Sequence, residues 1–209
     1  MSLVGTRTRR PLIIGLSVSA LILAVSTYIA SIQKLPLWEQ QVFTKIFNLP
    51  SGLYNIATFI TLFGSGWIVM GLVVTLIAIK RRELALQVFI LSSITFLIVQ
   101  FMKDTIARPR PVGLVADLTL KQYEATGFGF PSGHSALSMV CALVILPYVS
   151  RPWKLIIITG VILVGMSRIY LGVHAPLDVI GGWSLAIVLW SISKLFFSKN
   201  ILAKNTRKP

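Results

Sequence analysis

The stretch that decides the interpretation of this chain lies near its C-terminal end and reads SRIYLGVHAPLD, from Ser167 to Asp178. It contains His174, one of two histidines in the protein, and Asp178, the one acidic residue of the C-terminal third. Four residues separate them, so a helix that starts near Ala175 would bring the carboxylate close to the imidazole. A carboxylate that accepts a proton from one ring nitrogen leaves the other basic and oriented, as a nucleophile or base requires. Arg168 adds a permanent cation with a planar donor set suited to phosphate oxygens.

The composition around this stretch is that of a membrane protein. Of 209 residues, 55% are hydrophobic and 12% are charged, against about 25% charged in typical soluble domains. Ionisable groups in such an apolar chain indicate a functional site by default. The net charge of +14 would suit nucleic acid or anionic lipid. Because the basic residues lie at the ends of apolar runs, we expect no nucleic-acid partner. Cys141 is the lone cysteine, which excludes an intrachain disulfide.

Six apolar runs predict an all-α membrane protein with six transmembrane helices in a single domain, residues 1–209. We expect the spans at 11–30, 52–79, 84–102, 135–149, 154–172 and 176–197, with a short, basic and mobile tail at 198–209. The first run is longer than the apolar region of a signal peptide, so we expect an uncleaved helix. The second run is longer than a bilayer requires, so it should tilt, or break at Gly64-Ser65-Gly66.

The segment 35–50 differs from its neighbours because apolar and polar residues alternate at helical spacing. Trp38, Phe43 and Phe47 stand among polar residues such as Glu39 and Lys45. This pattern predicts a short amphipathic helix in the membrane interface after the first span. A plain loop between spans is the alternative.

Basic residues are distributed unequally between the two sides that six spans would define. Thirteen fall on the side of both termini: Arg7, Arg9, Arg10, Lys80, Arg81, Arg82, Arg151, Lys154, Lys194, Lys199, Lys204, Arg207 and Lys208. Seven fall on the other side: Lys34, Lys45, Lys103, Arg108, Arg110, Lys121 and Arg168. The positive-inside rule therefore predicts a cell-membrane protein with cytoplasmic termini. Segments 103–134 and 167–174 should then face outward together.

Three polar clusters lie on this outward side. The first, at the exit of the third span, reads KDTIARPRP over residues 103–111; interfacial anchoring is an alternative role for its cations. The second reads PSGH over residues 131–134, where Ser132 could simply cap a helix and His134 could be an ordinary interfacial histidine. However, a Ser–Gly pair at a helix N-terminus also offers N–H groups and a hydroxyl to an anion. The third cluster is the stretch 167–178.

Together the clusters resemble the type-2 phosphatidic acid phosphatase superfamily, which also includes bacterial acid phosphatases and vanadium haloperoxidases. The family pattern is K-x6-R-P, then P-S-G-H, then S-R-x5-H-x3-D. This chain matches it without departure at Lys103…Arg110-Pro111, Pro131-Ser132-Gly133-His134 and Ser167-Arg168…His174…Asp178. The resemblance covers residues 103–178, and the six-span layout is similar to the membrane branch of the family.

The resemblance implies a phosphatase without cofactor or metal. His174 would be the nucleophile that becomes a phosphohistidine, with Asp178 holding its tautomer. His134 would protonate the leaving group and then take a proton from the hydrolytic water. The non-transferring oxygens would be bound by Lys103, Arg110, Ser132, Gly133 and Arg168. Phosphoryl transfer depends mainly on positioning and charge stabilisation, which three fixed cations can supply.

Other chemistries remain open at this stage. His134, His174 and Asp178 have the ligand types of a zinc site, but a metal among three cations is electrostatically unfavourable, and Mg²⁺ would need more carboxylates. A lipid phosphotransferase would use the same residues, with an acceptor lipid in place of water. A non-catalytic channel or transporter is the third alternative. Against it, no span carries a buried charge outside the outward clusters.

The expected partner is a lipid phosphate within the bilayer, because an interfacial site walled by apolar helices suits a headgroup whose tails stay in the membrane. Within the family, phosphatidylglycerol phosphate, phosphatidate and undecaprenyl diphosphate are the candidates. The loop 112–130 is expected to select the headgroup, through Leu114, Tyr123, Phe128 and Phe130. No obligatory protein partner is evident.

Overall fold

The computed structural model describes residues 9–115, 121 and 126–205, and this part of the chain is helical with no strands. The long helices are α2 (Arg9–Ser31), α6 (Arg82–Ile106), α8 (Arg151–Tyr170) and α9 (Pro176–Asn205). The shorter ones are α3 (Leu37–Phe47), α4 (Tyr54–Thr61), α5 (Gly66–Ala78) and α7 (Gly133–Ile145). Single 3₁₀ turns occur at η1 (Ser51–Leu53), η2 (Leu62–Gly64), η3 (Pro111–Gly113) and η4 (Leu146–Tyr148). The all-α prediction is therefore confirmed.

Four helices of the described chain are long and apolar enough to cross a membrane: Arg10–Ser31, Arg82–Ile106, Arg151–Tyr170 and Pro176–Phe196. Helix α3 and the segment Ser51–Gly64 would count as a fifth if this pair, bent by 82°, were one broken span. Helix α5 and the helix-plus-turn Gly133–Tyr148 are apolar but shorter. Many large apolar side chains on the outer faces are exposed, such as Leu21, Leu97 and Leu155. This is the surface expected of helices that contact lipid.

The run at 52–79 was expected to tilt or to break at Gly64-Ser65-Gly66, and the break is confirmed, as α4 passes through η2 into α5 at Gly64–Ser65. Ser65 caps α5 with its side chain, which accepts a hydrogen bond from the N–H of Ile68 at 3.4 Å. The expected tail at 198–209 is helical as far as Asn205, because α9 continues through it.

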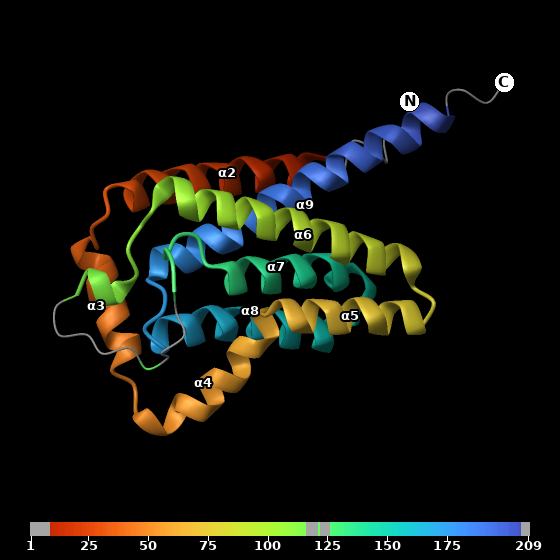
Figure 1. Ribbon diagram of the computed structural model, residues 1–209. Coiled ribbons are helices and arrows are strands. Elements are labelled where there is room, and N and C mark those ends of the chain that lie inside the picture. Colours follow the sequence, from red (N-terminus) through yellow and green to blue (C-terminus); the bar gives the residue numbers. More distant parts are fainter. Residues whose placement is uncertain (1–8, 116–120, 122–125, 206–209) are drawn as a thin grey trace.

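Helix α7 is the centre of the bundle and packs against α6, α8 and α9 (Figure 1). Helix α9 lies close to the N-terminus of α7 because Gly181 and Gly182 of α9 have no side chains in the way. A Cβ at Gly182 would lie 2.5 Å from the carbonyl oxygen of Ser132, and one at Gly181 would lie 2.4 Å from Cε2 of Phe130. Helix α2 lies along α9 on the outside. The close packing at Gly181 and Gly182 sets the distance between the α9 and α7 N-termini.

The N-terminal end of α2 and the C-terminal end of α9 lie at the same end of the bundle, and α3 lies at the opposite end (Figure 1). The C-terminal ends of α6 and α8 and the N-terminal ends of α7 and α9 meet at the α3 end. All three sequence clusters are located at these four helix ends.

Candidate active site

The site begins with a pair of buried side chains, His174 and Asp178. Nδ1 of His174 lies 3.4 Å from Oδ2 of Asp178, and the two residues are only 2% and 0% exposed. Asp178 is in the first turn of α9, and its Oδ2 also accepts the backbone N–H of Ala175 at 2.9 Å. Because the contact uses Nδ1, Nε2 is the ring nitrogen left for a substrate. The four-residue spacing has thus produced the expected pair.

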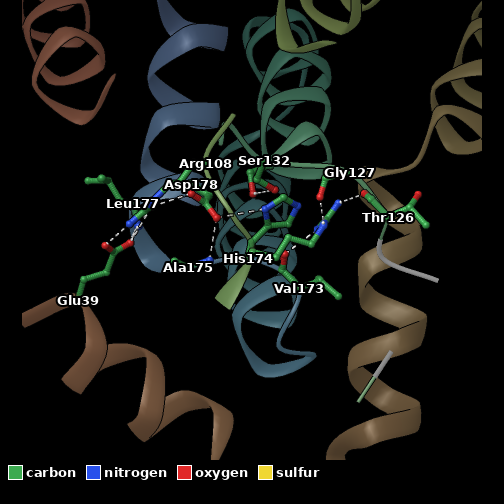
Figure 2. A network of polar contacts seen from close by, with 12 residues as sticks. Glu39, Arg108, Thr126, Gly127, Ser132, Val173, His174, Ala175, Leu177 and Asp178 are labelled. Carbon is green, nitrogen blue, oxygen red and sulfur yellow. Dashed lines mark hydrogen bonds and ion pairs between the residues drawn. The ribbon is translucent and has the colours of Figure 1, made fainter. Parts of the chain in front are cut away.

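Arg108, predicted from the sequence only to be a cation on the outward side, joins Asp178 to Glu39 of α3. Its Nη1 donates to Oδ1 of Asp178 at 2.8 Å, and its Nη2 donates to Oε2 of Glu39 at 2.6 Å. All three side chains are fully buried. Figure 2 shows the resulting line from Glu39 through Arg108 and Asp178 to His174. The one usable signal for Glu39 is that it is a single acidic residue in a predicted amphipathic helix, and no sequence pattern indicates its partner.

The predicted phosphate-binding residue Arg110 lies beside the histidine loop. Its Nη1 donates to the carbonyl oxygen of Val173 at 2.6 Å. Its Nε and Nη2 donate to the carbonyl oxygens of Gly127 and Thr126 at 3.0 and 2.7 Å (Figure 2). A guanidinium has five N–H groups. Three of them make these contacts and hold Arg110 beside the loop that carries His174.

Arg168 is at the end of α8 and is 5% exposed. Its Nη1 donates to Oγ1 of Thr61 at 2.9 Å, which ties it to α4. Its carbonyl oxygen accepts the N–H groups of both Val173 and His174 at 3.2 Å, so the turn that carries the histidine folds back onto this residue. Gly172 permits that turn, since its φ of +79° is in the left-handed region.

The N-terminus of α7 contains the expected Ser132, Gly133 and His134. Ser132 occupies the N-cap position but makes no capping hydrogen bond with its side chain; its Oγ accepts from Oγ of Ser135 at 3.1 Å. The simple capping role is therefore wrong. A Cβ at Gly133 would meet Cγ1 of Val99 at an ordinary 3.6 Å, so packing does not require glycine here. Both observations leave the hydroxyl and the first N–H groups suited to an anion.

His134 follows one residue inside α7, and Gly64 of η2 is packed against it. A Cβ at Gly64 would lie 2.6 Å from the carbonyl oxygen of His134 and 2.8 Å from its Cβ. The break between α4 and α5 therefore lies directly against this histidine.

Three cations act on the two histidines. The charges of Lys103, Arg110 and Arg168 all reach both rings. Burial, followed by Arg168, Arg110 and Lys103, holds the pKa of His174 well below its usual value. Its imidazole is therefore neutral near pH 7 and keeps a lone pair for nucleophilic attack.

The pKa values of Arg108 and Arg110, the two arginines that follow α6, are shifted in opposite directions. Burial opposes the charge of Arg108, but the carboxylates of Asp178 and Glu39 raise its pKa. Burial lowers the pKa of Arg110. Both remain charged, because a guanidinium starts from a pKa above about 12.

The donor set does not favour a metal at this end of the bundle. Among the residues that the structure describes, no group of three His, Cys, Asp or Glu side chains could hold a metal ion. The alternative zinc set of His134, His174 and Asp178 is therefore not assembled. Asp178 is instead committed to Arg108, to the N–H of Ala175 and to His174.

The loop expected to select the headgroup is only partly described, and Tyr123 lies outside the described residues. Leu114 and Phe128 remain near the surface. The prediction that Phe130 helps to select the lipid headgroup is wrong, because its side chain is fully buried against Gly181. Lys121 was predicted only as a cation on the outward side. Its Nζ lies 3.7 Å from the ring centre of Tyr170 and donates a hydrogen bond to the carbonyl oxygen of Phe47.

Helices of membrane-spanning length and a buried His–Asp pair near three cations are the features of a helical membrane protein with a buried cationic site at one end of the bundle. The sequence profile of the PAP2 superfamily matches residues 83–202, and the chain belongs to this membrane lipid phosphatase family. The resemblance inferred from the three motifs is confirmed.

Known relatives agree with this assignment. Undecaprenyl-diphosphatase of Sulfolobus acidocaldarius is 30% identical over 141 residues, covering 66% of this chain and 68% of that protein. Phosphatidylglycerophosphatase B of Bacillus subtilis is 40% identical over 109 residues, covering 47% of this chain and 50% of that protein.

Two crystal structures have the same fold. Aquifex aeolicus LpxE superposes with a TM-score of 0.69 at 29% identity and covers 75% of this chain and 94% of its own. The first transmembrane PAP2-type phosphatidylglycerolphosphate phosphatase from Bacillus subtilis has a TM-score of 0.67 at 26% identity and covers 85% and 94%.

Proposed function

We propose that this chain is a membrane-embedded hydrolase that removes the terminal phosphate from a lipid phosphate or diphosphate through a phosphohistidine. The observation that carries the proposal is the buried contact between His174 Nδ1 and Asp178 Oδ2, surrounded by the charges of Lys103, Arg110 and Arg168. The relatives support undecaprenyl diphosphate and phosphatidylglycerol phosphate as candidate substrates, and the family resemblance adds phosphatidate.

The first half-reaction transfers the phosphoryl group to the protein. Nε2 of His174 attacks phosphorus as the bond to the leaving oxygen breaks. Burial and the charges of Arg168, Lys103 and Arg110 lower the pKa of His134 to about 3, so His134 becomes protonated together with binding of the anionic phosphate, which offsets those cations. His134 then gives the leaving oxygen that proton. The proton on Nδ1 stays on the ring, which becomes cationic and is stabilised by Asp178. The non-transferring oxygens are bound by the proposed cradle of Lys103, Arg110, Ser132, Gly133 and Arg168, which supplies charge stabilisation without a metal.

The second half-reaction regenerates the protein. His134, now neutral, takes a proton from a water molecule while the water oxygen attacks phosphorus. The N–P bond breaks, inorganic phosphate leaves, and His174 returns to its neutral form. Interception of the phosphohistidine by an acceptor lipid would instead give a phosphotransferase.

We also propose one six-span domain over residues 1–209, with α3 in the membrane interface, cytoplasmic termini and an outward-facing site. The N-terminal end of α2 and the C-terminal end of α9 lie opposite the α3 end (Figure 1), and the sequence assigns thirteen of the twenty basic residues to the side of both termini. The positive-inside rule supports this orientation.

A panel of purified lipid phosphates and diphosphates tests the proposed chemistry. The wild-type protein in EDTA should release phosphate from at least one of them, and His174→Ala should release none. Absence of release from every lipid, or activity that requires added zinc, would contradict the proposal. Appearance of a phosphorylated acceptor lipid would identify a phosphotransferase.

A further inference from the structure

Two carboxylates share one guanidinium behind the candidate nucleophile. Arg108 Nη1 lies 2.8 Å from Oδ1 of Asp178 and 3.2 Å from Oε1 of Glu39, and its Nη2 lies 2.6 Å from Oε2 of Glu39. Nη2 also donates to the carbonyl oxygen of Lys34 at 3.3 Å. Glu39 is on α3, outside the residues 83–202 that the family profile matches. Neither the motifs nor the profile assigns Glu39 a role.

We propose that Glu39 and Arg108 are positioning residues that act on His174 through Asp178, by fixing the orientation of its carboxylate and keeping its negative charge effective. This inference rests on the proposed phosphohistidine mechanism. It gives the first 80 residues of the chain a part in the chemistry.

The orientation of Asp178 is fixed from two sides. Oδ1 is held by Arg108, while Oδ2 is held by the N–H of Ala175 at 2.9 Å and faces His174. Glu39 also accepts the N–H of Leu177 through Oε1 at 2.8 Å, so it holds the first turn of α9 on which Asp178 lies (Figure 2). Removing Glu39 would loosen both Arg108 and this turn.

The net charge that Asp178 and its partners present to His174 depends on Glu39. The ring of His174 becomes cationic when Nε2 bonds to phosphorus, and three cations nearby oppose this. Asp178 paired with Arg108 alone would present no net charge to the ring. With Glu39 included, the group of three has one net negative charge, and in a buried environment this difference is large.

A purely structural ion pair is the competing explanation. Taking two carboxylates and a guanidinium out of water is unfavourable, and apolar replacements of buried pairs are often neutral or stabilising. Stability alone therefore gives little reason to bury Glu39 and Arg108. A structural pair would also affect the yield and Tm of the protein without changing the turnover of each folded molecule.

The test is Glu39→Gln, which keeps one acceptor oxygen for Leu177, removes the charge, and replaces the oxygen that accepts from Arg108 Nη2 by an NH2 group. Phosphoenzyme formation from p-nitrophenyl phosphate, referred to monodisperse protein, should slow about tenfold to a hundredfold, as for partners that orient metal-bound histidines. KM should be unchanged, because Glu39 does not touch substrate. The matched control is Glu83→Gln, the same change at an exposed position at the start of α6, which should behave as wild type.

A double variant separates charge from structure. Glu39→Gln/Arg108→Met removes both charges and leaves Asp178 as the net negative group, still held through Oδ2 by the N–H of Ala175. It should form phosphoenzyme faster than Glu39→Gln alone but more slowly than wild type, because Oδ1 has lost Arg108. If Glu39→Gln yields no monodisperse protein, the rate of phosphoenzyme formation by the double variant is the test, and the double variant should still be active. Wild-type rates in Glu39→Gln, or a double variant that is no faster than the single or is inactive, would overturn the inference. A wild-type protein that hydrolyses no lipid phosphate would overturn the proposed function and this inference with it.

Discussion

Gly64 offers a direct test of whether the position of His134 matters. A Cβ at this residue would lie 2.6 Å from the carbonyl oxygen and 2.8 Å from the Cβ of His134, and 2.9 Å from Cγ1 of Val164. Ordinary contact begins at 3.4 Å, so Gly64→Ala requires η2 and α7 to separate by about 0.8 Å. Two of the three atoms that the added Cβ would overlap belong to His134. They are its carbonyl oxygen and Cβ, which can move only if the central helix α7 moves with them.

The expected effect on turnover follows from that displacement. A misplacement of about 1 Å can reduce turnover by about a hundredfold, so Gly64→Ala should reduce lipid phosphate hydrolysis by about tenfold to a hundredfold. Reaction with p-nitrophenyl phosphate should fall less, because its leaving group hardly needs the proton from His134. Overpacking should also destabilise the protein by about 1–3 kcal/mol, although Gly→Ala at a relaxed position stabilises by about 0.4–1 kcal/mol.

The matched control is Gly71→Ala in α5, where an added Cβ meets nothing within 4 Å. We expect wild-type turnover and an unchanged or higher Tm for this control. Phosphate release and thermal unfolding in the same detergent measure both quantities. Wild-type turnover of lipid phosphate in Gly64→Ala would refute the reasoning, since the helices would have absorbed the overlap without displacing His134.

Three further predictions follow from the same geometry. Arg168→Lys keeps the charge but loses the planar donor fork, so kcat should fall severely; near-normal phosphate release would reduce Arg168 to an anchor. The folded pKa of His174 lies below its unfolded value of about 6.5, so the folded state binds fewer protons and stability should fall as the pH drops below about 6.5. The decrease in Tm on acidification should therefore be smaller in His174→Gln, and equal decreases would contradict this. In a Cys141→Ala background, Asp104→Cys should react with an impermeant thiol reagent in intact cells and Arg151→Cys should not; the reverse labelling would invert the topology.

Much of the site could be predicted from sequence because its residues lie at helix ends. Apolar runs locate the spans, and the alternation of direction places the ends at Lys103, His134, Arg168 and Asp178 on one side. The break at Gly64–Ser65 was also predictable, since the run 52–79 is too long for one span and contains a glycine pair.

What the sequence could not indicate are contacts that depend on distant packing. Glu39 and Arg108 are separated by 69 residues, and no local period relates them. Phe130 was assigned to the loop surface because a single sequence does not reveal the space that Gly181 leaves for its ring. The end of α7 was also misjudged, since the helix gives way at Leu146 to a 3₁₀ turn that contains Pro147, before the expected end at 149.

The central claim is that His174 carries the phosphoryl group and His134 moves the proton. The most direct measurement is mass-spectrometric mapping of the phosphoenzyme formed by His134→Ala with p-nitrophenyl phosphate. Without His134, water is not activated, so the phosphoenzyme should accumulate, and the label should lie on His174. A stable phosphoenzyme in His174→Ala with the label on His134, or no phosphohistidine in either variant, would contradict the account.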